Sequence, residues 1–223
     1  MTKKEAIHAV VFDLDGLMFN TEELYVQVGA EVLRRRGKRF TPELVDAMMG
    51  LRPSQAIQRM IDWHHLEATV EEIENESREI FIPLLDDHLQ PMPGLMDLLA
   101  ALEEAGIPKA VATSSGRLFV AEVLGRFDLM PRFRFLLTAE DVTEGKPNPE
   151  IYLRAAERFG LTPEEILVLE DSQTGTAAGV ASGALVVAVP GAHSAHHEFT
   201  GASFVAHHLA DPRIYAVLAL PPT

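Results

Sequence analysis

Five short apolar runs, separated by longer stretches, limit the fold of this chain more than any other feature of its sequence. They span residues 7–12, 109–113, 133–138, 166–170 and 184–189. Their mostly apolar composition is typical of strands that are buried on both faces, as in a parallel sheet. The stretches between the later runs have the spacing of amphipathic helices. This alternation predicts right-handed crossovers, so we expect an α/β fold: a Rossmann-like three-layer αβα sandwich with a mostly parallel sheet.

The segment between the first two runs, residues 17–88, contains no strand-like run and is expected to be helical. Its expected helices span residues 21–37, 41–50, 53–66 and 69–85. Thr21 is the expected cap of the first helix. We therefore expect two domains, a core of residues 1–16 and 89–223 and a helical cap of residues 17–88 that is inserted after the first strand. A weaker run at residues 203–209 is an expected edge strand.

Length, charge and cysteine content bound the class of protein. The chain has 223 residues, 47% of them hydrophobic and 23% charged, as is ordinary for a globular protein with a sizeable core. Its formal net charge of −14 would repel a long polyanion, so we expect no nucleic acid and no membrane as partner. The absence of cysteine excludes disulfides and thiolate metal sites. The apolar segment near the N-terminus is too short for a signal peptide, and we expect a cytoplasmic monomer.

Polar side chains gather where the predicted strands end. They are Asp13, Asp15, Thr113, Ser114, Ser115, Lys146, Glu170 and Asp171. Ligands of open α/β sheets bind at the carboxyl ends of the strands, so we expect these side chains at one edge of the sheet. Each of them alone could be a turn or helix-cap residue. Acidic residues at two separate strand ends would repel one another, however, so the joint pattern indicates a bound cation.

The donor set indicates a hard cation and phosphoryl chemistry. Carboxylate oxygens without cysteine or histidine suit Mg²⁺, which binds a few carboxylates together with waters and substrate phosphate oxygens. Residues i and i+2 of a strand point to the same side, so Asp13 and Asp15 can share one pocket. One carboxylate can then attack phosphorus while the other transfers protons. Lys146, the Thr113 hydroxyl and nearby backbone N–H groups can stabilise the charge of a phosphoryl group.

Four sequence motifs coincide with these strand ends. They are FDLDG at residues 12–16, VATSS at 111–115, GKPNPEIY at 145–152 and VLEDSQTG at 168–175. With these motifs in this order, and a helical insertion just after the first, the chain resembles the haloacid dehalogenase superfamily, specifically its phosphatase and β-phosphoglucomutase-like branch. The resemblance covers nearly the whole chain. It implies a Mg²⁺ cofactor and a small phosphorylated metabolite as the substrate.

The resemblance implies a role for each catalytic residue. Asp13 would be the nucleophile that forms a phospho-aspartyl intermediate, and Asp15 would be the general acid for the leaving alcohol and then the base for water. Thr113 and the backbone N–H of Ser114 would hold the phosphate, and Lys146 would bridge Asp13 and the phosphate. Asp15 also favours phosphoryl transfer over dehalogenation, because a halide needs no proton to leave.

The resemblance also implies the metal ligands. Mg²⁺ would be bound by Asp13, by the backbone carbonyl of Asp15 and by Asp171, with Glu170 either a direct ligand or one step removed from the ion. Adjacent residues of a strand point in opposite directions. Glu170 and Asp171 can therefore share an ion only if the chain has begun to turn.

The cap is expected to determine the choice of substrate and to exclude water when it closes. Glu22, Tyr25 and Arg52 are its expected substrate-facing residues. Arg52 can meet a second phosphate or a polar substrate edge, or it can be a solvated arginine. Tyr25 stands where related mutases have a histidine, which argues against a mutase. Asn20 departs from the family, which usually has an acidic residue before the Thr-Glu pair.

Three hypotheses for function follow. The leading one is a Mg²⁺-dependent phosphatase that hydrolyses a small phosphomonoester, either a sugar phosphate or a nucleoside or pseudouridine-type phosphate, through a phospho-aspartyl intermediate. The alternative is a β-phosphoglucomutase-like phosphosugar mutase, which would need a bisphosphate primer. The third is a phosphate-binding protein without catalysis, which would lack a motif residue, and none is missing here.

Two other features are expected to be structural. The histidines at positions 193, 196, 197, 207 and 208 have no carboxylates at a spacing that suits a metal site. The basic run at residues 34–39 lies at an expected helix C-terminus, where cations are favourable, so a binding site for a polyanion is not needed to explain it.

Overall fold

The computed structural model describes residues 6–48, 51 and 53–221. The chain divides into two compact units, with the boundaries after Phe19 and after Gln90. We call Asn20–Gln90 the helical unit and the remainder the core unit. Each unit is described by itself below.

The core unit is built on a six-stranded sheet. Its strands are β1 (Ala9–Phe12), β2 (Lys109–Ala112), β3 (Leu136–Leu137), β4 (Ile166–Glu170), β5 (Leu185–Ala188) and β6 (Phe204–Val205). They lie in the order β3-β2-β1-β4-β5-β6, and every neighbouring pair is parallel. The predicted α/β sandwich is confirmed, and its described sheet is parallel throughout. The third run forms a shorter strand than expected, because β3 pairs with β2 through two residues.

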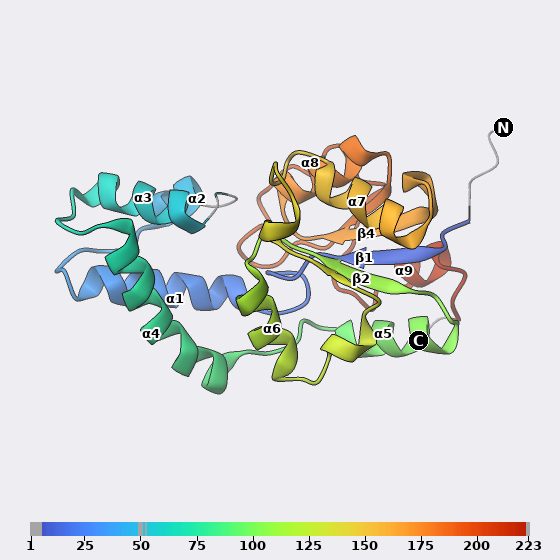
Figure 1. Cartoon of the computed structure of the whole chain (residues 1–223), viewed down its shortest axis with the longest axis horizontal. Helices are drawn as coiled ribbons and strands as arrows, with labels where there is room; N and C mark the ends of the chain where they lie inside the picture. The colour runs from blue at the N-terminus through green and yellow to red at the C-terminus, as the bar shows by residue number, and fades with distance from the viewer. Residues whose placement is uncertain (1–5, 49–50, 52, 222–223) are drawn as a thin grey trace. The chain divides into compact units, whose positions relative to one another are not determined.

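Helices cover both faces of this sheet. The helical elements are α5 (Leu95–Glu104), α6 (Arg117–Gly125), α7 (Glu150–Phe159), α8 (Gln173–Ser182) and α9 (Pro212–Val217), with short 3₁₀ turns η1 (Met130–Arg132), η2 (Ala139–Asp141) and η3 (Pro163–Glu165). Figure 1 shows α7 and α8 on one face and α5 and α6 on the other. Ala9 and Val11 of β1 pack in a cluster with Ala155 of α7 and Ala178 of α8. Because both faces are covered, the strands read as continuous apolar runs.

A tight turn follows β1 and sets the boundary between the units. Gly16 has a φ of 76°, a conformation that suits glycine, and its N–H donates to the carbonyl of Phe19 at 2.9 Å. Phe19 also forms a bridge with Pro91, and its ring lies 5.2 Å from that of Phe127. Leu17 is buried as well. These contacts bind residues 17–19 to the core, so the boundaries fall after Phe19 and Gln90 rather than after residues 16 and 88.

The helical unit contains four helices in its described residues. They are α1 (Thr21–Arg34), α2 (Pro42–Met48), α3 (Pro53–His64) and α4 (Val70–His88). The expectation that Thr21 caps the first helix is wrong, because α1 begins at Thr21 and Asn20 holds the cap position. The Asn20 side chain does not cap the helix. Its Oδ1 accepts the N–H of Gln90 at 2.8 Å and its Nδ2 donates to the carbonyl of His88 at 3.1 Å.

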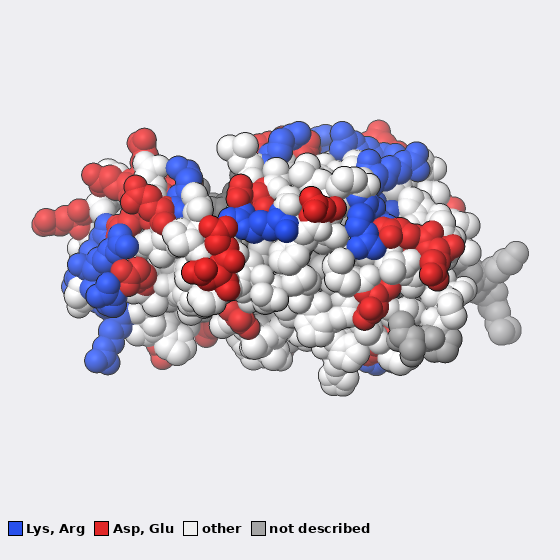
Figure 2. Space-filling model, turned by 90° about the horizontal axis from the view of Figure 1, so that it is seen from below, with Lys and Arg blue, Asp and Glu red and all other residues white. Residues whose placement is uncertain are grey.

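Charges of both signs are interspersed on the face of the molecule that Figure 2 shows. In the basic run at the end of α1, Arg34 and Arg35 pair with Glu31 at 2.6 and 2.9 Å, and Arg36 pairs with Glu76 at 2.6 Å. Exposed pairs of this kind contribute little to stability. They nevertheless match three of the cations in the run with carboxylates of the same unit, which favours the structural explanation of the run.

Among the helices that the structure describes, none is both long enough and apolar enough to cross a membrane.

Candidate active site

Asp13 and Asp15 follow β1 at the carboxyl edge of the sheet. The N–H of Asp13 donates to the carbonyl of Leu169 at 3.0 Å, so the ladder between β1 and β4 continues one residue past the strand. Leu14 is fully buried in the core, Asp13 is 6% exposed, and Asp15 is partly exposed. The alternation of this segment is therefore as predicted, with the leucine in the core and the two aspartates on its polar side.

Lys146 joins two carboxylates at this edge. Its Nζ lies 2.5 Å from Oδ1 of Asp13 and 2.6 Å from Oε1 of Glu170, and it donates to the carbonyl of Ala112 at 3.0 Å. The three protons of the ammonium group thus have three acceptors. The lysine side chain is 5% exposed and that of Glu170 is 0% exposed. A lysine from the loop before α7 therefore connects β1, β2 and β4 in a buried ion-pair network.

Three acidic side chains form a cluster that suits a cation. One carboxylate oxygen each from Asp13, Glu170 and Asp171 lies within 4.8 Å of the others. β4 ends at Glu170, so Asp171 begins the turn and both carboxylates can reach the same place. Lys146 supplies one positive charge to this group of three carboxylates, so a further cation would reduce the remaining repulsion, and an all-oxygen set fits Mg²⁺. Among the residues that the structure describes, no histidine belongs to a group that could hold a metal ion.

The loop of residues 113–116, which follows β2, holds Asp15. Oδ2 of Asp15 accepts the hydroxyl of Thr113 at 3.2 Å and the hydroxyl of Ser115 at 2.6 Å. The N–H of Ser115 in turn donates to Oγ1 of Thr113 at 3.0 Å. Thr113 is buried, whereas Ser114 is exposed. This 113–116 loop therefore carries hydroxyl and N–H groups beside the second aspartate, as predicted.

Burial and neighbouring charges set the protonation of the site. Burial raises the pKa of Asp13 well above its usual range; Lys146 opposes this rise, and Glu170 and Asp15 add to it. Burial alone would lower the pKa of Lys146, but the charges of Asp13 and Glu170 outweigh it and hold the pKa above its usual value. Lys146 is therefore a permanent cation at neutral pH. A further positive charge at the acidic cluster would favour the ionised form of Asp13.

The family model described as haloacid dehalogenase-like hydrolase matches residues 10–189 of the chain, which include all four motifs and this whole edge. The chain belongs to this family.

Several relatives of this hydrolase are phosphatases by name. A phosphorylated carbohydrates phosphatase from Thermotoga maritima is 31% identical over 181 residues, which cover 79% of this chain and 82% of that protein. A probable pseudouridine-5′-phosphatase from Drosophila melanogaster is 34% identical over 207 residues, which cover 90% and 89% of the two chains. The expected membership of the superfamily and the expected class of enzyme, a phosphatase, are thus confirmed.

The fold is shared with a solved structure. The crystal structure of CbbY from Rhodobacter sphaeroides in complex with phosphate has a TM-score of 0.80 and is 27% identical; the match covers 91% of this chain and 95% of that chain. The match includes the α/β sandwich whose carboxyl edge carries the candidate active site.

The substrate-facing residues expected in the cap belong to the helical unit. Glu22 and Tyr25 lie one turn apart on α1. The ring of Tyr25 is stacked on that of Phe81 of α4 with centroids 4.9 Å apart, and Tyr25 is 43% exposed. Arg52 lies outside the described residues. The part of these residues in substrate choice stays a prediction.

Sequence reasoning missed the residues that hold Glu170. Tyr152 of α7, fully buried, donates its hydroxyl to Oε1 at 2.6 Å, and the hydroxyl of Ser172 donates to Oε2 at 3.0 Å. A Cβ atom on Gly175 would lie 1.8 Å from Oε1, so this carboxylate fills space that only a glycine leaves. Tyr152 lies in the third motif, and Ser172 and Gly175 lie in the fourth. The spacing of Tyr152 along its helix is that of an ordinary core residue, however, and does not indicate its hydrogen bond to Glu170.

Asp171 also has a partner that the sequence did not indicate. Ser194, in the loop after β5, is 1% exposed, and its hydroxyl lies 3.5 Å from Oδ2 of Asp171 while accepting the N–H of Gly191 at 3.1 Å. No motif includes this serine. The loop after β5 therefore borders the acidic cluster.

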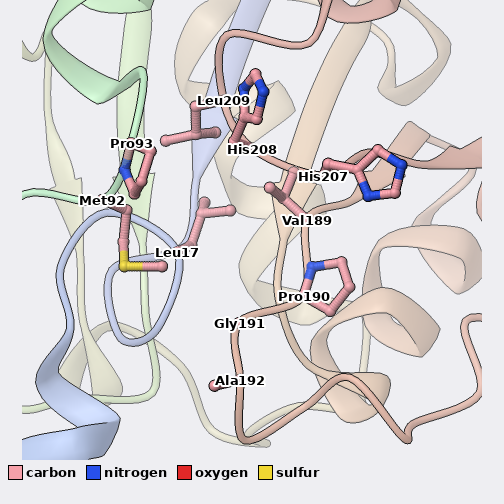
Figure 3. Close-up of a pocket in the computed structure, with 10 residues that line it drawn as sticks. All are labelled: Leu17, Met92, Pro93, Val189, Pro190, Gly191, Ala192, His207, His208 and Leu209. Atoms are coloured by element: carbon pink, nitrogen blue, oxygen red, sulfur yellow. The ribbon is translucent and has the colours of Figure 1, made fainter.

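A cavity of about 230 Å³ lies in the core unit. Figure 3 shows the residues that line it. Its walls are mostly apolar, with Leu17, Met92 and Leu209 among them, and the exposed His207 and His208 also line it. Its described lining residues include no carboxylate, lysine or arginine. This lining does not suit a divalent cation or a phosphate, so the candidate active site is the carboxylate edge.

Proposed function

We propose that this chain is a Mg²⁺-dependent phosphatase that hydrolyses a small phosphomonoester through a phospho-aspartyl intermediate. We also propose that the protein is a cytoplasmic monomer. Its proposed substrate is a small phosphorylated metabolite, and no nucleic acid or membrane is a proposed partner. The observation that carries it is the place of Asp13, whose carboxylate lies 2.5 Å from the ammonium group of Lys146 and within a cluster that includes Glu170 and Asp171.

In the first step, a carboxylate oxygen of Asp13 attacks phosphorus. The new O–P bond forms as the bond from phosphorus to the alcohol oxygen breaks, and that oxygen takes a proton from Asp15. Ser115 holds the carboxyl group of Asp15 for this transfer. Lys146 stabilises negative charge on the phosphoryl oxygens.

In the second step, Asp15 is the base. Its carboxylate takes a proton from water, the water oxygen attacks phosphorus, and the bond between phosphorus and Asp13 breaks. Inorganic phosphate leaves and Asp13 is again a carboxylate. Asp15 therefore ends the cycle protonated and ready for the next substrate, which explains why the site needs two aspartates with different surroundings.

Mg²⁺, when bound, would neutralise charge on the phosphoryl oxygens and fix their orientation. The ligands that we propose are the carboxylates of Asp13 and Asp171 and the backbone carbonyl of Asp15, with Glu170 either a direct ligand or one step removed. The donor set supports this assignment, because Lys146 supplies only one positive charge to three buried carboxylates that lie this close together, and a divalent cation would offset the remaining repulsion.

The proposed substrates are sugar phosphates and nucleoside or pseudouridine-type phosphates. The names of the relatives from Thermotoga maritima and Drosophila melanogaster support this class. In the helical unit, the half-exposed ring of Tyr25, stacked on Phe81, offers a flat surface that suits a sugar or base ring.

The test is phosphate release from a panel of sugar and nucleoside monophosphates, with and without Mg²⁺. Wild-type protein is expected to release phosphate in the presence of Mg²⁺ and to lose this activity with a chelator. Asp13→Asn, which keeps the size of the side chain, is expected to lower kcat by about 10³-fold or more because the nucleophile is removed.

Two outcomes would contradict the proposal. Release by Asp13→Asn at the wild-type rate would exclude Asp13 as the nucleophile. Isomerisation of a hexose phosphate that needs a bisphosphate primer, without net phosphate release, would replace the phosphatase with the mutase. Assaying both reactions on one preparation separates these results.

A further inference from the structure

The short turn η2 contacts the 113–116 loop from the side of β3. The N–H of Ala139 donates to the carbonyl of Ser115 at 3.0 Å. The N–H of Arg117, the first residue of α6, donates to both carboxylate oxygens of Glu140, each at 3.1 Å. Neither Ala139 nor Glu140 belongs to a motif that the sequence analysis identified.

Glu140 supplies the cap that α6 lacks. The cap position of α6 is Gly116, which has no side chain to accept a hydrogen bond, so the carboxylate of Glu140 from another segment takes that place. The contact is close, because a Cβ atom on Gly116 would lie 3.2 Å from Oε1 of Glu140. The nearby Thr138 and the N–H of Arg117 lower the pKa of Glu140.

The turn that presents Glu140 is itself held firmly. Thr138 is 1% exposed, and its N–H and hydroxyl donate to Oδ2 of Asp141 at 2.9 and 2.8 Å. Asp141 also pairs with the guanidinium of Arg117 at 3.0 Å. A fixed support therefore holds Glu140 against the end of the 113–116 loop.

We propose that Glu140 is a positioning residue that sets the affinity of the enzyme for the phosphate part of its substrate. It acts through the 113–116 loop, whose Thr113 and Ser114 are the proposed phosphate donors, so the inference rests on the proposed function. A loop that is already ordered binds phosphate without first losing conformational freedom. The phosphoryl group contacts the loop both in the bound substrate and in the transition state, so the effect belongs in KM rather than in kcat.

The test compares Glu140→Ala with Glu140→Gln and with a matched control, Glu165→Ala. Glu165 also caps a 3₁₀ turn, accepting the N–H of Thr162 at 2.8 Å, but it directly precedes the first residue of β4, at the opposite edge of the sheet. For each protein we would measure kcat and KM for one phosphomonoester, the inhibition constant of inorganic phosphate, and its dissociation constant by calorimetry with Mg²⁺.

Glu140→Ala is expected to raise KM and both phosphate constants about fivefold, within the range that a lost helix cap allows, with kcat changed less than about twofold. Glu140→Gln keeps an acceptor oxygen and should stay within about twofold of wild type, as should Glu165→Ala. Glu140→Asp keeps the charge but is one methylene shorter. It is expected to raise the constants about twofold, and it replaces the alanine variant if that one does not fold.

Unchanged phosphate constants in Glu140→Ala, with a loss of thermal stability equal to that of Glu165→Ala, would overturn the inference and leave Glu140 a purely structural cap. A fall in kcat with KM unchanged would overturn it as well. If the wild-type protein releases no phosphate from any monoester, the proposed function fails. The calorimetric comparison of phosphate binding still decides the role of Glu140 in that case.

Discussion

A buried tyrosine hydroxyl is one of the hydrogen-bond donors to Glu170. Oε1 of Glu170 accepts the hydroxyl of Tyr152 and the ammonium group of Lys146, both at 2.6 Å. Burial and the charge of Glu170 raise the pKa of Tyr152 well above its usual value, so the phenol remains a donor at neutral pH. Tyr215 is buried to a similar degree, but its hydroxyl has no hydrogen-bond partner among the described residues. Substitution of Tyr215 is therefore a suitable control for substitution of Tyr152.

Tyr152→Phe is expected to lower the free energy of unfolding by about 2 kcal/mol, because a hydrogen bond to a charged group contributes about 1.5–3 kcal/mol. Tyr215→Phe removes a hydroxyl without a partner and should stay within about 0.5 kcal/mol of wild type or gain stability. Urea denaturation of the three proteins at neutral pH measures the difference. Equal losses in the two variants would contradict the role assigned to the Tyr152 hydroxyl.

The candidate site residues at the strand ends could be predicted from the sequence, but the residues that support them through hydrogen bonds could not. Asp13, Lys146 and Asp171 come together as expected, because parallel strands bring their carboxyl ends to one edge. Tyr152 and Glu140 lie on a helix and a turn whose neighbours depend on the packing of distant segments. α7 packs on β1 and β2, and from there the Tyr152 hydroxyl reaches Glu170 at the end of β4. A periodic pattern shows that such a residue is buried, but not which polar atom it meets.

At the scale of elements, the ends of the helical unit are joined by a side chain. Asn20 precedes α1, and its amide bonds to His88 at the end of α4 and to Gln90 beyond it. The amide is suited to this place, because it accepts one hydrogen bond and donates another. A carboxylate, which the resemblance described above leads one to expect here, accepts but cannot donate to the carbonyl of His88. The departure noticed in the sequence thus has a structural explanation.

Asn20→Ala is expected to speed hydrogen exchange of the Gln90 amide about fivefold, since a net hydrogen bond contributes about 1 kcal/mol. Asn20→Asp keeps the acceptor for Gln90 and should protect this amide better than the alanine variant does. Exchange measured by NMR at the single amide checks both. An unchanged rate in Asn20→Ala would show that the side chain does not hold the two ends together.

Strand positions follow from the sequence better than the exact ends of the elements. Each of the five predicted apolar runs contains one of the strands β1 to β5, because a strand that is buried on both faces has a strongly apolar sequence. The start of α1 differs from the prediction, since Asn20 and Thr21 are both good caps by type. The Asn20 side chain instead makes tertiary contacts with His88 and Gln90, which a local pattern does not contain.

At the scale of the whole molecule, the residues proposed for catalysis lie in the core unit rather than in the inserted helical unit. The proposed nucleophile, the proposed acid and base, the lysine and the acidic cluster all belong to the core unit, although the chain leaves and re-enters that unit between Asp15 and Thr113. An insertion after the first strand is tolerated because the sheet edge is assembled from segments on both sides of it. The reaction proposed here therefore depends on residues of one unit.

The most direct test of the account is to trap the phosphoryl group on Asp13. Wild-type protein would be acid-quenched during turnover with Mg²⁺ and treated with borohydride, which reduces an aspartyl phosphate to homoserine. Peptide mass spectrometry is predicted to find homoserine at position 13 in wild type and not in Asp13→Asn. Turnover without modification at position 13, or with the modification at another residue, would contradict the central claim that Asp13 carries the phosphoryl group.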